Sequence, residues 1–467
     1  MFNKKLIPIL KCQFTAILLI GITACCVAQK QNKNYAVKKG VNVILIIADD
    51  AGWNDVGYNG SEIKTPNIDL LASKGVKLDR FYTAPTCTPS RAALLIGMPA
   101  SRIGIVAPID GKSEKTLPNT IVTLPQALKK HNYQNALIGK WHLGLDISNG
   151  PNAFGFDYSY GFLHGQIDQY THVYKNGDKS WYRNDKIIEE QGHATDLITK
   201  EAISWMTQKR DTTKNFYLQI AYSAPHYPLQ EEDKWKEPYL KTIKDNSRRD
   251  YAAAMSHLDY AIGEVLASIK QNKLDENTLI VFMSDNGAQQ NWYPNKEYNL
   301  IHGPNPVLGS NTPLRDFKTS NYEGAIRVPA ILYWKDHLTA QDNQNYISVT
   351  DIMPTILSLT GTKIPKDVEG VNVWPSIVDN KIKTKHDIYI RGHKQESLLH
   401  KPWKLIRQRN DKGNPVIFQL YNIETDPEEK VNLIDKDAVL TAKMKVLLEQ
   451  QFVKDDQNVN AGFSKGE

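Results

Sequence analysis

Two pairs of oxygen-bearing side chains stand at the ends of two apolar runs. Asp49-Asp50 comes directly after VNVILIIA, and Asp285-Asn286 stands at the end of a second run, LIVFMS. Each run is typical of a strand buried on both faces. Because successive strand side chains point to opposite faces, Asp49 and Asp50 can converge only where the chain leaves the sheet. Each pair alone is typical of a turn. Together, three carboxylates and an amide favour a hard oxygen site for Ca²⁺ or Mg²⁺ rather than zinc.

The segment Cys87-Thr88-Pro89-Ser90-Arg91 is the sharpest feature of the chain. Pro89 suits the first turn of a helix, which places Cys87 just ahead of the helix N-terminus. The free N–H groups and the positive dipole end there favour an anion, and Arg91 adds a cation with forked donors. A free cysteine is most often a small buried hydrophobe, but one beside positive charge is a candidate nucleophile. These arguments leave the reaction open.

Further cations and histidines follow other predicted strands. Lys140 and His142 lie in GKWHLG and face the same side if the chain stays extended, and His226 lies in APH. A lysine there supplies positive charge, and a histidine can transfer protons near neutral pH. Lys318, taken alone, would be a solvated surface lysine. A histidine in a loop is more often structural than catalytic, and we give the structural interpretation to three others: His164, His193 and His257.

Strands and helices alternate along most of the chain, which predicts an α/β fold with a large, mostly parallel sheet sandwiched by helices. Ligands of such sheets bind beyond the carboxyl ends of the strands. After about residue 375 the pattern changes to short strands and one helix, so we expect a catalytic domain over 41–375 and a small α+β subdomain over 376–467. The strands are predicted at 41–48, 135–139, 216–221, 279–283, 328–333, 387–391, 403–408 and 416–422. The helices are predicted near 66–75, 193–209, 249–270 and 438–450, and a further helix begins near 123.

The N-terminus is typical of an export signal. Residues 1–24 carry three lysines and no acid, and their apolar run is shorter than the ~20 residues that span a bilayer. The segment Ile22-Thr23-Ala24-Cys25 resembles a lipobox. It predicts an exported, periplasmic or cell-surface protein that is anchored by a lipid at Cys25. Cleavage after Ala28 is the competing interpretation, with an unlipidated product. Residues 25–40 are polar and rich in lysine, which predicts a tether.

Composition and cysteine content narrow the class of protein. The 467 residues are 41% hydrophobic and 23% charged, as in an ordinary globular protein. The 57 basic and 51 acidic residues nearly balance, so the net charge of +6 gives little reason to expect nucleic-acid binding. Cys12, Cys25 and Cys26 fall in the signal or at its processing site. Only Cys87 remains in the folded part, so no internal disulfide is expected.

Six blocks in a fixed order resemble the formylglycine-dependent sulfatases, from about Asn42 to the C-terminal subdomain. They are NVILIIADDAGWNDVGYNG, CTPSRAALLIG, GKWHLG, APHYPLQ, SDNG and KTSNYEG. Three parts of the sequence are most similar to the arylsulfatase B branch, the N-acetylgalactosamine-4-sulfatases and their bacterial relatives. These are the residues around the cysteine pentapeptide, the segment PLRDFK and the segment LYNIETDPEEKVNL. One departure is Ala325 after Glu323-Gly324, where the family often has a second glycine. The resemblance implies an alkaline-phosphatase-like fold.

The resemblance also implies roles for individual residues. Cys87 matches the cysteine that an installing enzyme oxidises to formylglycine (3-oxoalanine), whose hydrate attacks sulfur. Arg91 would hold the hydrate, and Lys140 and Lys318 would grip sulfate oxygens. His142 would accept a proton when sulfate is expelled, and His226 would protonate or polarise the leaving oxygen. The implied Ca²⁺ ligands are Asp49, Asp50, Cys87 in its modified form, Asp285 and Asn286.

The expected substrate is a sulfated galactose or N-acetylgalactosamine unit, in chondroitin or dermatan fragments or in algal galactans such as carrageenan. The loops 154–174 and 292–311 are rich in Tyr, Trp, His and Asn, which suits sugar binding. Two alternatives stay open. One is a phosphatase or phosphonate monoester hydrolase of the same superfamily, although we find no second set of His and Asp ligands for a two-metal site. The other is an unmodified, inactive lipoprotein that binds glycans.

Overall fold

The computed structural model describes residues 40–111, 113–175, 177–408 and 416–459. They belong to one compact unit that begins at Lys39. The predicted export signal, and the predicted tether up to residue 39, lie outside the described residues. Among the residues that are described, no helix is long and apolar enough to cross a membrane.

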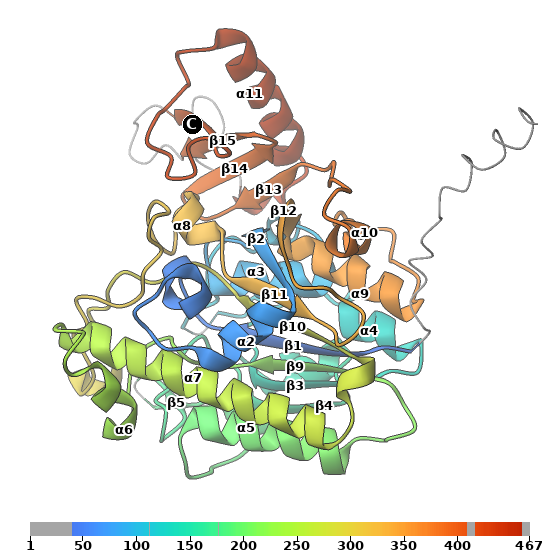
Figure 1. Cartoon of the computed structure of the whole chain (residues 1–467), viewed down its shortest axis with the longest axis vertical. Coiled ribbons are helices and arrows are strands. Elements are labelled where there is room, and N and C mark those ends of the chain that lie inside the picture. Colours follow the sequence, from blue (N-terminus) through green and yellow to red (C-terminus); the bar gives the residue numbers. More distant parts are fainter. Residues whose placement is uncertain (1–39, 112, 176, 409–415, 460–467) are drawn as a thin grey trace, which may run out of the picture. The chain divides into compact units, whose positions relative to one another are not determined.

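A ten-stranded sheet forms the centre of the molecule (Figure 1). Its central strands, from β10 to β4, are all parallel, and antiparallel strands lie toward both edges. This confirms the predicted mostly parallel α/β sheet. In spatial order the strands are β12 (Gln341–Ser348), β2 (Val76–Tyr82), β11 (Ala330–Tyr333), β10 (Thr278–Ser284), β1 (Asn42–Ala48), β9 (Phe216–Ala221), β3 (Gln134–Lys140), β4 (Tyr158–Phe162), β7 (Trp181–Arg183) and β8 (Lys186–Ile187).

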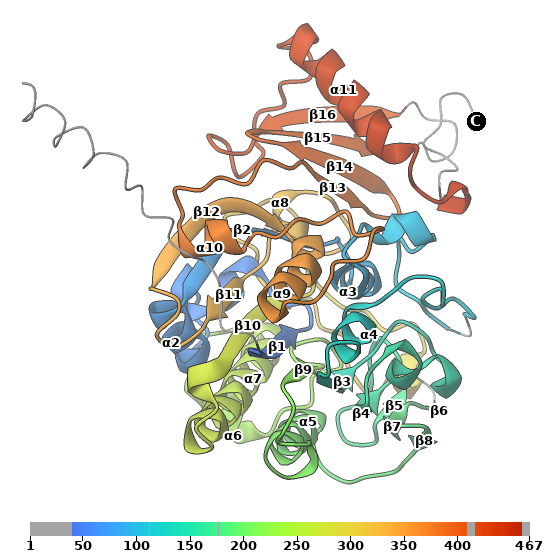
Figure 2. The same ribbon diagram turned by 90° about the vertical axis from the view of Figure 1, so that its right-hand side faces the viewer.

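Helices cover both faces of this sheet (Figures 1 and 2). Ile44 and Ile46 of β1 belong to the apolar core that one helix layer completes. That layer comprises α2 (Pro66–Lys74), α5 (Ala194–Ser204), α6 (Asp233–Lys236) and α7 (Asn246–Gln271). The other face carries α3 (Cys87–Ile96), α4 (Leu124–Lys129) and α9 (Ile352–Thr360), and the short helices α8 (Glu323–Ile326) and α10 (Trp374–Val378) lie nearer the C-terminal part.

A second sheet of four antiparallel strands follows in the chain, with α11 (Ala438–Phe452) packed against it. Its strands are β13 (Ile388–Arg391), β14 (Gln395–His400), β15 (Trp403–Gln408) and β16 (Ile417–Asn422). Buried Lys404 joins this sheet to α8 through an ion pair with Glu323 at 3.0 Å. The α+β character agrees with the sequence, and the boundary at residue 375 stays a prediction. A separate two-stranded sheet pairs β5 (Val173–Tyr174) with β6 (Asp178–Lys179).

Candidate active site

The two acidic pairs meet because the strands that carry them are neighbours. β1 and β10 run parallel in register, with Ala48 opposite Ser284, so both pairs leave the same edge of the sheet. Asp50 has a φ of 68°, so the strand alternation ends at this residue. Its backbone N–H donates to Asp285 Oδ1 at 3.2 Å, and Asn286 Nδ2 donates to its Oδ1 at 2.7 Å. The predicted convergence is confirmed as geometry.

Two oxygens of this cluster fit a bound cation. Asp49 Oδ1 and Asn286 Oδ1 are buried and have no hydrogen-bond partner. A buried oxygen without a donor is destabilising, and a bound cation would satisfy it. Asp49, Asp50 and His226 also offer ligand atoms that lie within 4.8 Å of one another. Carboxylate and amide oxygens suit Ca²⁺ or Mg²⁺, so the residues present fit the metal that the sequence implies.

Each carboxylate of the cluster is paired with a cation. Lys140 Nζ lies 2.6 Å from Asp49 Oδ2, and Lys318 Nζ lies 2.8 Å from Asp50 Oδ2. Lys318 is therefore no solvated surface lysine, since its side chain is only 7% exposed. The family departure at Ala325 leaves Lys318 in the site. The three charged carboxylates and the three fixed cations have a net charge of zero. A divalent ion would therefore make the site positive and favourable for an anion.

Arg91 is the third of these cations. Its Nε and Nη2 donate to Asp285 Oδ2 at 2.9 and 2.7 Å, and its Nη1 donates to the carbonyl oxygen of Lys140 at 3.2 Å. In this structure Arg91 thus orients Asp285 and the end of β3. Its predicted contact with an aldehyde hydrate stays a prediction.

The two aspartates differ in their ionisation. Burial raises the pKa of Asp49 to about 7, against the opposing effect of Lys140. Burial acts in the same direction on Asp50, but Lys318 and His226 outweigh it and lower the pKa of Asp50 to about 2. A metal ion beside Asp49 would favour its charged form, because a bound cation is the largest local charge in such a site.

Cys87 is the first residue of α3 and faces a histidine. Its Sγ lies 3.3 Å from His142 Nδ1, while His142 Nε2 donates to the Ile109 carbonyl oxygen at 2.9 Å. The Nδ1 lone pair therefore points at residue 87. Burial, followed by Lys140, holds the pKa of His142 well below its ordinary value, so this histidine is neutral. His142 has a φ of 59°, so the expected extended chain ends at Lys140, although both side chains reach the site.

The surroundings of Cys87 do not favour an activated thiol. The helix N-terminus and nearby cations predict an activated thiol, but burial raises the pKa of Cys87, and Asp285 and Asp49 act in the same direction. The side chain is buried among charges of both signs, with Lys140 and Lys318 unable to offset the burial. The unmodified thiol is therefore a poor nucleophile here. This geometry suits a residue that is altered before it reacts.

His226 lies on the other side of Asp50. Its Nδ1 donates to the Tyr227 carbonyl oxygen at 2.7 Å, and its Nε2 lies 3.5 Å from Asp50 Oδ2. Burial lowers the pKa of His226 to about 3, with Lys318 adding to the effect and Asp50 opposing it. Cys87, Arg91, Lys140, His142, His226 and Lys318, which the sequence singled out separately, thus surround one buried cluster.

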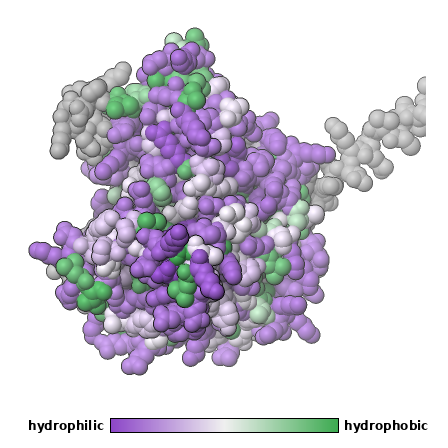
Figure 3. All heavy atoms as spheres, turned by 60° about the vertical axis from the view of Figure 1, so that its left-hand side comes forward, coloured by the Kyte–Doolittle hydropathy of each residue, from purple (hydrophilic) through white to green (hydrophobic). Residues whose placement is uncertain are grey.

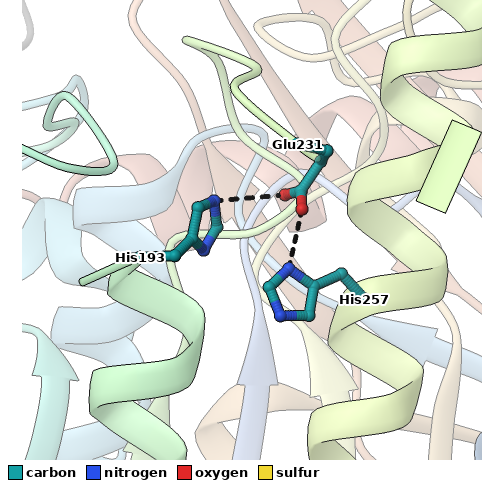
Figure 4. Close-up of side chains that lie close together, drawn as sticks. All are labelled: His193, Glu231 and His257. Carbon is teal, nitrogen blue, oxygen red and sulfur yellow. Dashed lines mark hydrogen bonds and ion pairs between the residues drawn. The ribbon is translucent and has the colours of Figure 1, made fainter. Parts of the chain in front are cut away.

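A second group of titratable side chains, His193, Glu231 and His257, shares no residue with this site (Figure 4). His257 Nδ1 lies 2.6 Å from Glu231 Oε2, and its Nε2 lies 3.0 Å from Asp196 Oδ1. His193 Nδ1 accepts the Thr195 N–H at 3.3 Å, so its proton sits on Nε2, which faces Glu231 Oε1 at 3.5 Å. In this group each donor nitrogen of a histidine thus faces a carboxylate oxygen. The group joins α5, α7 and the loop after β9, in agreement with the structural interpretation of these histidines.

The two loops expected to bind sugar meet each other above the sheet. His302 Nε2 lies 2.8 Å from Asp168 Oδ2, and Gln166 Nε2 donates to Tyr298 Oη at 3.3 Å. Sequence reasoning did not assign a role to the Ile109 carbonyl, which fixes His142, or to the Tyr227 ring, which lies against His226. The Ile109 contact leaves no signal in the sequence, whereas Tyr227 is signalled only by its place beside His226.

Comparison with known proteins agrees with this geometry. A model of the sulfatase family matches residues 41–362. This chain belongs to the sulfatase family. The family comprises sulfuric ester hydrolases, and the match includes every candidate site residue. A second model, of the C-terminal region of N-sulphoglucosamine sulphohydrolase, matches residues 316–456.

Individual relatives are similar over most of this sulfatase chain. Arylsulfatase J of Mus musculus is 34% identical over 368 residues, which are 74% of this chain and 57% of that protein. The chain thus spans little more than half of that relative. N-acetylgalactosamine-6-sulfatase of Mus musculus is 32% identical over 376 residues, 75% of this chain and 69% of that protein. The arylsulfatase B branch is not singled out by these matches.

A solved structure resembles this sulfatase over nearly all of its length. The crystal structure of Ps i-CgsB in complex with k-i-k-neocarrahexaose superposes with a TM-score of 0.79 at 32% identity, and covers 90% of this chain and 94% of that chain. The likeness includes the large sheet and the C-terminal sheet, which confirms the predicted fold class.

Proposed function

We propose that this protein hydrolyses sulfate esters of carbohydrates, with Cys87 converted to formylglycine and Ca²⁺, or Mg²⁺, in the oxygen site. The observation that carries the proposal is one buried cluster in which Cys87 faces a neutral histidine beside three fixed cations and two unpaired oxygens. The sulfatase family supports the reaction class. The raised pKa of the Cys87 thiol supports the need for the modification.

The metal would be held by Asp49, Asp50, Asp285, Asn286 and residue 87. When bound, it supplies positive charge that withdraws electrons from the sulfate group. The hydrated aldehyde of formylglycine supplies a hydroxyl that attacks sulfur and a second hydroxyl that lets sulfate leave without attack by water. The chain itself positions the residues that would hold these groups: the acidic pairs follow β1 and β10, and residue 87 begins α3.

The chain's own cations bind and orient the sulfate. Lys140 and Lys318 each end beside a carboxylate of the cluster, so their ammonium groups point into the site and do not fold away from it. Sulfuryl transfer builds negative charge on the peripheral oxygens. Fixed ammonium groups in a buried site stabilise that charge without reorganisation. Arg91 keeps Asp285 and the end of β3 in place while this happens.

Each of the two histidines serves a different proton transfer. The lone pair on His142 Nδ1 faces residue 87, where it can accept a proton from a hydroxyl. His226 Nε2 points toward Asp50 and the sulfate side of the site. An anionic substrate favours the charged form of a nearby imidazole, so substrate binding raises the pKa of His226 and enables it to protonate the leaving oxygen.

The proposed substrate is a sulfated galactose or N-acetylgalactosamine unit of a polysaccharide or oligosaccharide. The neocarrahexaose bound in the similar crystal structure and the N-acetylgalactosamine-6-sulfatase relatives support this class of sugar. We further propose membership of the arylsulfatase B branch, on the sequence blocks given above. An installing enzyme for formylglycine is a required partner. Export to the periplasm or cell surface, with a lipid on Cys25, rests on the sequence of the N-terminus alone.

The test is sulfate release from carrageenan and chondroitin oligosaccharides after coexpression with a formylglycine-installing enzyme. Sulfate release that disappears in Cys87→Ala supports the proposal. A phosphate monoester and a phosphonate monoester are the controls, and release from these esters alone would assign the chain to phosphoester hydrolysis instead. Glycan binding without turnover, despite modified residue 87, would favour the inactive lipoprotein.

A further inference from the structure

A stack of three rings leads away from the active site at His226. The centroids of the His226 and Tyr227 rings lie 4.1 Å apart at an interplanar angle of 37°. The Tyr227 ring in turn stacks on Trp292 at 4.4 Å and 14°. Tyr227 is thus placed between the histidine and the tryptophan. Neighbouring aromatic rings attract one another in particular orientations, so the arrangement restricts the rings.

Trp292 is the fixed end of this stack. Its side chain is buried, and its backbone exchanges two hydrogen bonds of 2.8 Å with Asn305, which closes the loop between them. Its Nε1 donates to Glu297 Oε2 at 3.2 Å. Gly303, with a φ of 73°, packs where a side chain would meet the indole ring at 3.3 Å. These contacts hold the indole from several directions.

The same loop reaches the other catalytic histidine through charged contacts. Glu297 Oε1 lies 3.3 Å from Lys175 Nζ, and Lys175 Nζ lies 2.9 Å from Asp110 Oδ1. The preceding residue, Ile109, accepts the hydrogen bond from His142. The loop between Trp292 and Asn305 therefore supports both sides of the active site, although its tip is open to solvent, with Leu300 59% and Ile301 74% exposed. Figure 3 shows such apolar side chains as small separate groups on a mostly hydrophilic face.

We propose that Trp292 is a positioning residue for His226, acting through the Tyr227 ring. The proposal rests on the proposed function, in which His226 protonates the leaving oxygen. Among the described residues, the His226 imidazole makes one hydrogen bond, from Nδ1 to the carbonyl oxygen of Tyr227, and its Nε2 lies 3.5 Å from Asp50 Oδ2. Neither contact restrains the face of the imidazole that lies against the Tyr227 ring, so that ring must itself be held in place. The indole provides this support. General acids act only within hydrogen-bond reach, so a small displacement of the imidazole lowers the rate.

The test compares two sulfate esters that differ in their need for an acid. Phenyl sulfate has a poor leaving group, and 4-nitrophenyl sulfate has a good one. We expect Trp292→Ala to lower kcat/KM for phenyl sulfate about 10- to 100-fold, and for 4-nitrophenyl sulfate less than about threefold. Trp292→Phe keeps a ring against Tyr227 and should stay within about threefold of the wild type for both esters.

Two controls separate positioning from general damage. Trp235→Ala removes a ring that stacks on His257 at 4.6 Å and 15°, in the second cluster, and should leave the ratio of the two esters unchanged. In a His226→Ala background, Trp292→Ala should cause no further loss, because the residue that it positions is gone. Equal losses on both esters, or an additive loss in that background, would overturn the proposal.

A crystal structure of Trp292→Ala provides a readout that does not depend on turnover. We expect the imidazole of His226 to be displaced or to occupy more than one orientation, and an unmoved ring would overturn the proposal. Should Trp292→Ala fail to fold, Trp292→Leu, which removes the aromatic face and keeps an apolar side chain in the same space, makes the same tests. Absence of sulfate release by the wild type from any ester would instead contradict the proposed function.

Discussion

The active-site cluster and the His193–Glu231–His257 cluster are both buried groups of histidines and carboxylates, but they are completed in different ways. In the active site the atoms without a hydrogen bond are oxygens, namely Asn286 Oδ1 and Asp49 Oδ1, of which the latter lies 3.8 Å from Arg91 Nη2, and oxygens can bind a cation. In the second cluster the unpaired atom is His193 Nε2, a donor that already faces the oxygen of Glu231 at 3.5 Å. The first cluster is arranged for a ligand, and the second joins parts of the chain.

The charges around the histidines explain a second difference. Burial lowers the pKa values of His142 and His226, and Lys140 and Lys318 act in the same direction, although Asp50 opposes them at His226. Carboxylates surround His257, and although burial opposes them, the hydrogen bonds with Asp196 and Glu231 raise its pKa to about 9. Neutral imidazoles can transfer protons, whereas a permanently charged one serves as half of an ion pair. Burial alone thus does not separate a catalytic histidine from a structural one.

Removal of the nucleophile should have the largest effect. We expect Cys87→Ala to abolish sulfate release, because no other described residue faces His142 Nδ1. The midpoint of thermal unfolding should change little, since the substitution deletes one sulfur atom beside a polar cluster. Sulfate release measured by ion chromatography, with thermal unfolding as the control, tests both parts. Residual turnover near the wild-type rate would contradict the assignment of residue 87.

Removal of His226 should come next in size. We expect His226→Ala to lower kcat/KM about 10²- to 10⁴-fold for poor leaving groups, and much less for activated aryl sulfates. His164→Ala is the matched control, because His164 is also buried but bonds to Ser180 at 2.8 Å and takes no part in the cluster. Equal losses on both kinds of ester in His226→Ala would contradict the leaving-group role.

Metal removal tests the contrast between the clusters directly. A chelator should suppress turnover, and calcium should restore it where zinc does not, because the unpaired ligands are oxygens. Elemental analysis should show loss of the cation in Asp285→Asn, since Asp285 binds both Arg91 and the Asp50 backbone. His257→Gln should keep its metal content. Metal loss in His257→Gln, or restoration by zinc alone, would reverse the roles of the two clusters.

The second cluster should make the free energy of unfolding depend on pH. The pKa of His257 in the folded protein, about 9, lies above its ordinary value of 6.5. The contribution of His257 to the free energy of unfolding is therefore fully present below pH 6.5 and is lost as the pH rises through 9. That contribution is about 3 kcal/mol at most. Urea unfolding of the wild type and of His257→Gln between pH 6 and 9.5 should show a difference that shrinks with rising pH. A difference that grows would mean that His257 is neutral when folded.

Much of the fold follows from local sequence patterns. β1 is buried along its whole length, as its apolar run predicts, and α7 begins within a few residues of the predicted start. β12 was not predicted because its sequence, QDNQNYIS, is polar. Its buried Asn343 is accommodated by a hydrogen bond to the Ser376 carbonyl oxygen, a tertiary contact that leaves no local signal. β2 differs from β12, because its alternating apolar and charged residues are typical of a half-buried strand and do carry a local signal.

The site was predictable in its parts and less so in its details. The strand-end positions of Asp49 and Asp285 and the sequence blocks identified the residues that meet. The burial of Lys318 was not predictable from its surroundings, because it depends on Asp50, which lies far away in the sequence. The same holds for the stack of Tyr227 on Trp292, which joins two loops. Contacts of this kind arise only from the folded arrangement.

The most direct test of the account is a paired measurement on one series of preparations. Mass spectrometry of the peptide that contains Cys87 gives the fraction converted to formylglycine, and sulfate release gives the rate per molecule. The series is obtained by varying coexpression of the installing enzyme. The rate should rise in proportion to the converted fraction and extrapolate to zero without conversion. A rate that does not depend on the converted fraction would contradict formylglycine as the nucleophile at residue 87.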